Sequence, residues 1–210
     1  MNIRQLKETI YHEFGHVIVY IISNKFEDIF LSKIDRFLIG YKNAVCPKEN
    51  LYYYILGETN QHITESSKNI KRSISWIILQ MSGCIFESHY EKRDFKNYFC
   101  NQRSCSGQKD FDNLYYFRHK SSFKIEDHDI VRIRENYIFL LNKHDIFNKT
   151  EKYLDHFLEI FDNNAYLNFD KDDIETLIDE MESFIINEEL IHDYHSMISM
   201  EAKNYTQNII

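Results

Sequence analysis

The chain contains few residues that interrupt a helix, with one proline and five glycines in 210 positions. In a helix interior, glycine is about 1 kcal/mol and proline about 3 kcal/mol less favourable than alanine. Several long stretches also repeat apolar residues at the period of an α-helix. We therefore predict a mainly α (α+β) fold, with a small β-sheet near the N-terminal third.

The apolar pattern also predicts where the elements lie. Short apolar runs at 29–31 and 37–39 flank a polar break and predict a small β-hairpin or sheet, to which 52–56 adds a strand. The predicted helices cover roughly residues 4–23, 64–90, 129–142, 149–162, 171–186 and 188–203, with a short helix opening at Asp110. No repeat or linker divides the chain, so we predict one domain over residues 1–210. Within it, residues 1–120 form the core that holds the candidate site, and residues 121–210 form a helical C-terminal part.

The chain is acidic, with a formal net charge of -8 at pH 7. Because acidic surfaces repel phosphates, we expect no binding to nucleic acid or anionic membranes. The longest apolar run near the N-terminus, residues 17–22, is far shorter than the roughly 20 residues that span a bilayer. The N-terminus also lacks the pattern of a signal peptide, so we expect no membrane span and a cytoplasmic location.

The four cysteines are too few and too scattered to predict a disulfide scaffold. Cys100 and Cys105 lie five positions apart and could bind a second metal, but no second close pair accompanies them. We therefore expect both to be reduced thiols in a loop.

Two histidines lie four positions apart in the first predicted helix, in the segment His12-Glu13-Phe14-Gly15-His16. Residues at i and i+4 share a helix face, so both imidazoles can converge on one zinc ion at roughly 2.0–2.1 Å. Glu13 follows the first histidine and can act as a general base beside the metal. The segment predicts a metal site, and its alternative is a pair of solvent-exposed histidines without a metal.

The same helix is predicted to be amphipathic. Its apolar stripe comprises Ile10, Phe14, Val17, Ile18 and Ile21. The two histidines fall on the opposite side of the helix. We therefore expect the stripe to be anchored in the core while the histidines line a cleft.

Four segments together resemble the zinc peptidase domain of the FtsH family, without the ATPase of that family. Residues 12–16 (HEFGH) are similar to its HEAGH helix, and residues 38–41 (LIGY) are similar to its LGYT strand. Residues 81–87 (MSGCIFE) resemble its GGRxAE helix, and residues 106–111 (SGQKDF) resemble the segment that carries its third metal ligand. The resemblance covers about residues 5–185 in family order, and four of the five glycines fall inside these segments.

The resemblance implies a zinc-dependent endopeptidase that hydrolyses peptide bonds of extended or unfolded polypeptides. It implies that His12, His16 and Asp110 hold Zn²⁺, with Glu13 as the general base. It also makes Glu87 a candidate partner that orients a zinc ligand. An ordinary helix-surface glutamate is the alternative at that position.

Two further assignments stay open in the sequence. Asp112 is a rival to Asp110 as the third ligand, although Asp110-Phe111 fits the Asp-Leu pattern of the family better. The strand around Gly40 and Tyr41 could pair with an extended peptide by β-augmentation. A plain core strand is the alternative there.

The chain also departs from the family, which bears on its substrate and partners. Phe14 replaces a small residue, Ser82 and Cys84 replace a glycine and an arginine, and a later glycine-rich stretch is missing. No phosphate-binding loop of the type GxxxxGKS or GxxxxGKT occurs. Besides a polypeptide substrate, we therefore expect a homo-oligomer or a separate ATPase as partner. The alternative functions are a non-hydrolytic metal-binding or interaction protein, against which the intact Glu13 argues, and a helical scaffold without metal.

Overall fold

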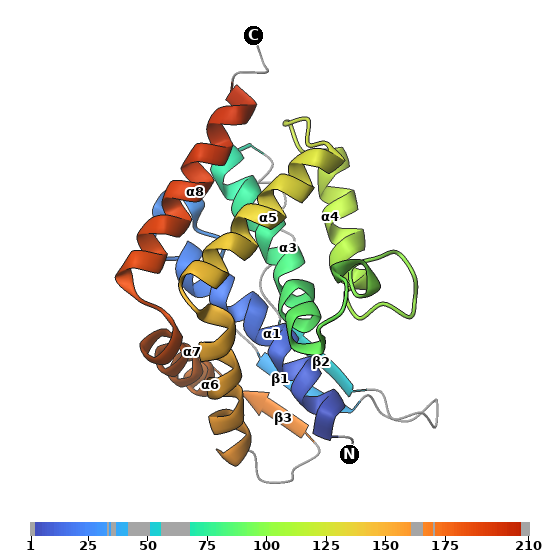
Figure 1. Ribbon diagram of the computed structural model, residues 1–210, viewed down its shortest axis with the longest axis vertical. Helices are drawn as coiled ribbons and strands as arrows, with labels where there is room; N and C mark the ends of the chain where they lie inside the picture. The colour runs from blue at the N-terminus through green and yellow to red at the C-terminus, as the bar shows by residue number, and fades with distance from the viewer. Residues whose placement is uncertain are drawn as a thin grey trace.

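The computed structural model describes residues 3–32, 34, 37–41, 51–55, 68–160, 166–169 and 171–206. In this part of the chain, seven α-helices enclose one hydrophobic core, and three short strands form a small sheet (Figure 1). The helices are α1 (Ile3–Ser23), α3 (Ile70–Glu91), α4 (Gln108–Lys120), α5 (Asp127–Lys143), α6 (Ile146–Ile160), α7 (Lys171–Ile185) and α8 (Glu188–Thr206). The strands are β1 (Phe37–Tyr41), β2 (Leu51–Ile55) and β3 (Tyr166–Phe169), and the short 3-10 helices are η1 (Glu27–Ile29) and η2 (Phe95–Asn97).

Helix α1 lies at the centre of the fold. It packs most extensively along α3, while α6, α7, α8 and β2 contact its other sides. Every side chain of residues 10–23 is buried, so this part of the helix is enclosed on all its faces. The prediction of an amphipathic helix whose histidines line a cleft is therefore corrected, because the histidine side of α1 faces α3.

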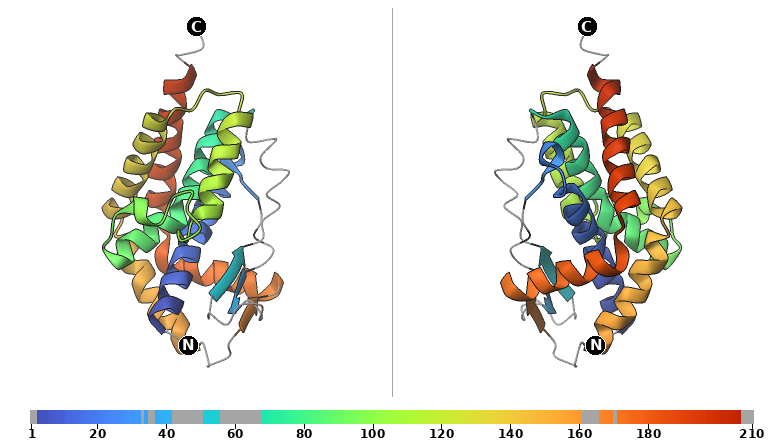
Figure 2. Two further views of the ribbon diagram at one scale, coloured as in Figure 1. Left: turned by 90° about the vertical axis from the view of Figure 1, so that its right-hand side faces the viewer. Right: turned by 90° about the vertical axis from the view of Figure 1, so that its left-hand side faces the viewer.

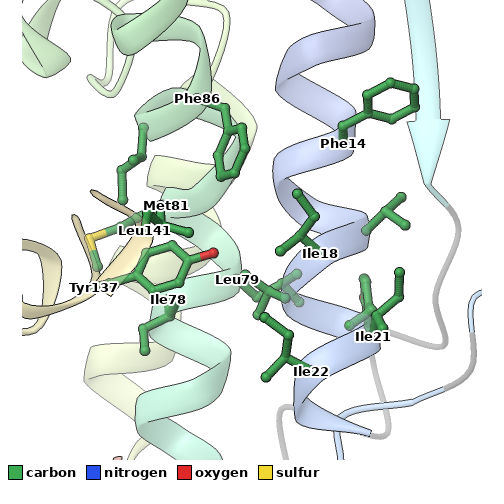
Figure 3. Close-up of a cluster of buried hydrophobic side chains, with 14 of the residues drawn as sticks. Phe14, Ile18, Ile21, Ile22, Ile78, Leu79, Met81, Phe86, Tyr137 and Leu141 are labelled. Atoms are coloured by element: carbon green, nitrogen blue, oxygen red, sulfur yellow. The ribbon is translucent and has the colours of Figure 1, made fainter. Parts of the chain in front are cut away.

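The core between α1 and α3 is built from interlocking isoleucine and leucine side chains. Figure 3 shows Ile18 and Ile22 of α1 directed towards α3, where Leu79 lies between the two helices. Tyr137 and Leu141 of α5 cover the far side of α3. Full burial of each such aliphatic side chain contributes about 1.5–3 kcal/mol, so this contact fixes α1 against α3.

Helix α3 begins where its sequence supplies a cap. The Asn69 side chain accepts hydrogen bonds from the backbone N–H groups of Lys71 (3.0 Å) and Arg72 (3.2 Å). Such a cap satisfies donors that have no partner inside the helix, which determines where the helix starts. The predicted start near residue 64 is too early, since residues 68 and 69 are not helical.

The helices of the C-terminal part follow the sequence pattern closely. Each end of α5, α6, α7 and α8 lies within three residues of its predicted position. Helix α5 starts with a capping box, in which the side chains of Glu126 and Asp129 each accept a hydrogen bond from the other residue's backbone. Among the described residues, no helix combines the length and the apolar character needed to cross a lipid bilayer.

The prediction of an α+β fold with a sheet near the N-terminal third is wrong as stated. Helices form nearly all of the packed core, and the strands are short and lie beside the N-terminal half of α1 (Figure 2). Residues 29–31, predicted as a strand, are the end of η1 and an irregular segment. The third strand, β3, comes from the C-terminal part that was predicted to be helical. Its pairing with β1 joins segments far apart in sequence, which no local pattern reveals.

Candidate metal centre

His12 and His16 lie one turn apart on α1 and face α3. Their Nε2 atoms are 3.3 Å apart, and both side chains are buried. Gly83 of α3 lies against both rings, and a Cβ at this position would overlap the Nε2 atoms of both. The missing side chain at position 83 therefore leaves the space in which the two rings converge, as expected for a glycine at a close helix contact.

Each ring is oriented through its Nδ1 atom by a group on α3. His12 Nδ1 lies 2.9 Å from Glu87 Oε2, and His16 Nδ1 lies 2.8 Å from the backbone oxygen of Leu79. Both partners are acceptors, so in the neutral rings Nδ1 carries the proton and donates it. The lone pair of each neutral ring is then on Nε2, where the two histidines meet.

The third donor comes from α4. Asp110 Oδ2 lies 3.5 Å from the Nε2 atoms of both His12 and His16. Asp110 is in the first turn of its helix, where a carboxylate is favoured by the helix dipole. Asp112 is exposed on the same helix. Of the two rival carboxylates, the structure brings Asp110 to the histidines.

Glu13 is buried beside the histidines with one oxygen unpaired. Its Oε1 lies 3.8 Å from His12 Nε2 and has no hydrogen-bond partner among the described residues. Buried polar atoms are rarely left unpaired, because the lost hydration costs free energy. The unpaired oxygen is therefore able to accept a proton or a hydrogen bond.

The charges of these groups depend on each other. Burial alone would lower the pKa of His12, but hydrogen bonds to Asp110 and Glu87 outweigh it and raise the pKa to about 10. Burial would raise the pKa of Asp110, but His16 and His12 hold it well below its usual range. Burial raises the pKa of Glu13 to about 7. Three carboxyl groups around two rings thus make a site that favours a positive charge.

Two groups of side chains here could hold a metal ion. The sets His12–Glu13–His16 and His12–Cys84–Glu87 are buried, and within each set the ligand atoms lie within 4.8 Å of one another. His12 belongs to both sets, but Glu87 lies at its Nδ1, whereas His16 lies at its Nε2. Imidazole and carboxylate groups are common ligands of divalent metals in proteins.

The predicted substrate strand lies inside the sheet. Its strand, β1, is the central one in the order β2-β1-β3, and Gly40 is paired with Tyr52 of β2 and with Tyr166 of β3. Tyr41 is paired with Leu51. Because β-augmentation needs an unpaired edge, this arrangement corrects the prediction that the strand at Gly40 and Tyr41 receives a peptide. The outer strands of the described sheet are β2 and β3.

Two features near the site were missed in the sequence. Ser106 Oγ donates a hydrogen bond to Glu87 Oε2 at 2.6 Å. Cys100 and Cys105 form a disulfide bond, so the prediction of reduced thiols is wrong. Their short spacing was the one signal in the sequence, and it fits a thiol pair, a metal site and a disulfide equally well. Cys84 is a free, buried cysteine.

Comparisons with known proteins do not identify a family for this chain. No family model matches the chain, and no match exists among the curated proteins or the solved structures. The resemblance to FtsH-family peptidases therefore stays a prediction from the sequence. The geometry by itself supports a buried group of histidine, carboxylate and thiol side chains that could hold a metal ion.

Proposed function

We propose that this chain is a zinc-dependent endopeptidase that hydrolyses extended or unfolded polypeptides. One observation carries the proposal. The donor atoms of His12, His16 and Asp110 converge within 3.3–3.5 Å of one another, beside the unpaired carboxylate oxygen of Glu13. Catalytic zinc sites use three protein ligands and leave a fourth position for water or substrate.

The spacing of the three donor atoms fits zinc. Zinc binds histidine nitrogen at roughly 2.0–2.1 Å and carboxylate oxygen at roughly 2.0–2.2 Å, in tetrahedral geometry. Two ligand atoms of such a tetrahedron are about 3.3–3.5 Å apart. The observed separations are 3.3 Å between the two Nε2 atoms and 3.5 Å from each to Asp110 Oδ2.

Each residue of the site then has a chemical role. When bound, the metal supplies Lewis-acid chemistry, which polarises the scissile carbonyl and makes an attacking water more acidic. Glu13 accepts the proton of that water and passes it to the leaving amine. A pKa of about 7, raised by burial, suits a base that must both take up and release a proton near neutral pH. Glu87 and the Leu79 carbonyl fix the orientation of the two imidazole rings.

A non-hydrolytic metal-binding protein is the second candidate, and the burial of the site favours it. The side chains of His12 and Glu13 are each 1% exposed, whereas those of His16 and Asp110 are 11% and 20% exposed. A peptide would therefore have to approach from the side of Asp110. Against this candidate, a purely structural metal site has no use for the unpaired carboxylate of Glu13.

The test combines zinc analysis with cleavage of an unfolded protein. We expect the wild-type chain to bind one zinc ion and to cleave the substrate without ATP. Glu13→Gln should retain zinc and lose about 100- to 10,000-fold in cleavage rate, because it removes the general base. His16→Ala and Asp110→Asn should lose zinc, because each removes a ligand.

Asp112→Asn is the matched control, since Asp112 is exposed on the same helix as Asp110. This variant should keep both zinc and cleavage. A wild-type chain that cannot be loaded with zinc would refute the proposal. A zinc-loaded chain that cleaves no unfolded protein would favour the non-hydrolytic candidate.

A further inference from the structure

A short disulfide-closed loop lies between α3 and α4, beside the candidate metal site. Cys100 and Cys105 are bonded to each other and half-buried, and residues 101–104 between them are exposed. The disulfide is therefore within reach of a reagent in solution. At the base of this loop, the backbone N–H of Gly107 donates a hydrogen bond to the backbone oxygen of Tyr98 at 3.1 Å. This bond closes the loop.

Ser106 connects this loop to the first histidine of the site. Its hydroxyl donates to Glu87 Oε2 at 2.6 Å, and the same oxygen lies 2.9 Å from His12 Nδ1. Ser106 directly follows Cys105, so the disulfide restrains the position of Ser106. Ser106 in turn orients Glu87 through its hydrogen bond. Partners that orient a metal-binding histidine typically change metal affinity by about 10- to 100-fold.

The same loop also sets the start of α4, which carries Asp110. The N–H of Gln108 donates to the oxygen of Cys105 at 3.3 Å. Gly107 is packed so tightly against Cys84 Sγ that a Cβ would overlap the sulfur. A shift of Cys105 would therefore move both Ser106 and the first turn of α4.

We propose that the Cys100–Cys105 disulfide is a redox-controlled clamp on the metal site, and that its reduction by a dithiol weakens zinc binding. The inference rests on the zinc site of the proposed function. A thiolate of the dithiol attacks one sulfur of the loop, and its second thiol then displaces the other. The loop S–S bond breaks, Cys100 and Cys105 gain two electrons and two protons, and the dithiol becomes a disulfide.

The disulfide affects zinc binding through the conformational entropy of the loop. The cross-link joins residues five positions apart and excludes most alternative conformations of the loop. After reduction, the exposed residues 101–104 gain freedom, so ordering Ser106 against Glu87 costs more entropy.

The test measures the zinc affinity of the full chain by competition with a chromogenic chelator. The oxidised wild type is compared with protein reduced by a dithiol, which is then removed because dithiols bind zinc. We expect the reduced chain to bind zinc about tenfold more weakly and to recover on reoxidation. Cys100→Ser combined with Cys105→Ser should bind like the reduced chain under either condition.

Variants of Ser106 test the connection through Glu87. Ser106→Ala should weaken zinc binding about tenfold in the oxidised chain and reduce the effect of the dithiol, because the two changes act on one contact. Ser106→Thr keeps a hydroxyl and should restore the affinity. Ser104→Ala, in the exposed part of the same loop, is the matched control and should change nothing.

Equal zinc affinity in the oxidised and reduced wild type would overturn the inference, and this comparison needs no variant to fold. An undiminished dithiol effect in Ser106→Ala would overturn the route through Glu87. A wild type that binds no zinc in either condition would instead refute the zinc site itself. That outcome differs from equal binding in both conditions, so the two failures can be told apart.

Discussion

Two glutamates are almost fully buried in different parts of the molecule, and they differ in their partners. Glu13 on α1 is 1% exposed, and Glu201 on α8 is 2% exposed. Both oxygens of Glu201 are used: one accepts from Arg132 Nε at 2.9 Å, and the other from Asn136 Nδ2 at 2.5 Å. Glu13 Oε1 has no hydrogen-bond partner in the described part of the chain. Burial alone therefore does not reveal what a carboxylate does, whereas its partners do.

The difference follows from what lies opposite each glutamate. Arg132 and Asn136 are one turn apart on α5, so both reach the same carboxylate and join α5 to α8. Glu13 instead faces two histidines whose Nδ1 atoms are already engaged by α3. A buried charge without full pairing lowers stability, and proteins tolerate such groups mainly at functional sites. We interpret the Glu201 cluster as structural and the Glu13 cluster as reactive.

The largest expected contrast comes from replacing each glutamate by glutamine. Glu13→Gln should lose about 100- to 10,000-fold in cleavage rate but little free energy of unfolding, because its Oε1 has no hydrogen bond to lose. Glu201→Gln should lose about 1.5–3 kcal/mol of stability, because it removes the charge that Arg132 and Asn136 bind. Urea unfolding and cleavage by the folded fraction measure the two effects.

The folded Glu201→Gln chain should cleave at the wild-type rate, which serves as the control for Glu13→Gln. If Glu13→Gln destabilised the chain as much as Glu201→Gln does, Glu13 would be a structural residue and the comparison would fail.

A smaller effect is expected from adding a methyl group at the α1–α3 contact. Gly83→Ala places a Cβ against the Nε2 atoms of His12 and His16, so zinc affinity should fall by about 100-fold. Gly15→Ala places it 2.8 Å from the backbone oxygen of Ser82, away from those atoms, so it should mainly cost about 1–3 kcal/mol of stability. Chelator competition and urea unfolding distinguish the two. Equal zinc affinity in both variants would contradict this account of Gly83.

The smallest effect concerns pH, and its sign differs between zinc binding and folding. Zinc must displace the proton of His12, whose pKa is about 10 because Asp110 and Glu87 together outweigh burial. Zinc affinity should therefore rise by at most about tenfold from pH 7 to pH 8. In the metal-free chain, the stability contributed by protonated His12 is fully present below pH 6.5 and is lost as the pH rises towards about 10.

Glu13 adds to this loss of stability as the pH of the metal-free chain rises. Its pKa is raised from 4.5 to about 7 by burial, so the folded chain holds a proton that the unfolded chain releases at lower pH. Zinc titrations and urea unfolding of the metal-free chain over this pH range measure both trends. Stability that rises with pH from 6.5 to 9 without metal would contradict the assignment of these charges.

Parts of the candidate site could be predicted because their residues are close in sequence. His12, Glu13 and His16 occupy a little more than one helical turn, and helix geometry alone places the two rings on one face. Asp110 was inferred only from the order of family-like segments, and helical periodicity did not distinguish it from Asp112. Ser106 carried no signal, because its hydrogen bond to Glu87 depends on how a loop folds back on α3.

The sequence by itself determined that the chain is mostly helical and that two histidines share one face of its first helix. Both properties depend on residues within about four positions of each other, which the residue order states directly. Only the tertiary structure decided that the histidines face α3, that Asp110 lies 3.5 Å from both rings, and that Cys100 and Cys105 are joined. The contacts of the histidines with α3 and with Asp110 bring together segments far apart in the sequence, and the packing of the whole core determines which of them meet. The disulfide joins residues only five positions apart, but it depends on how their loop folds.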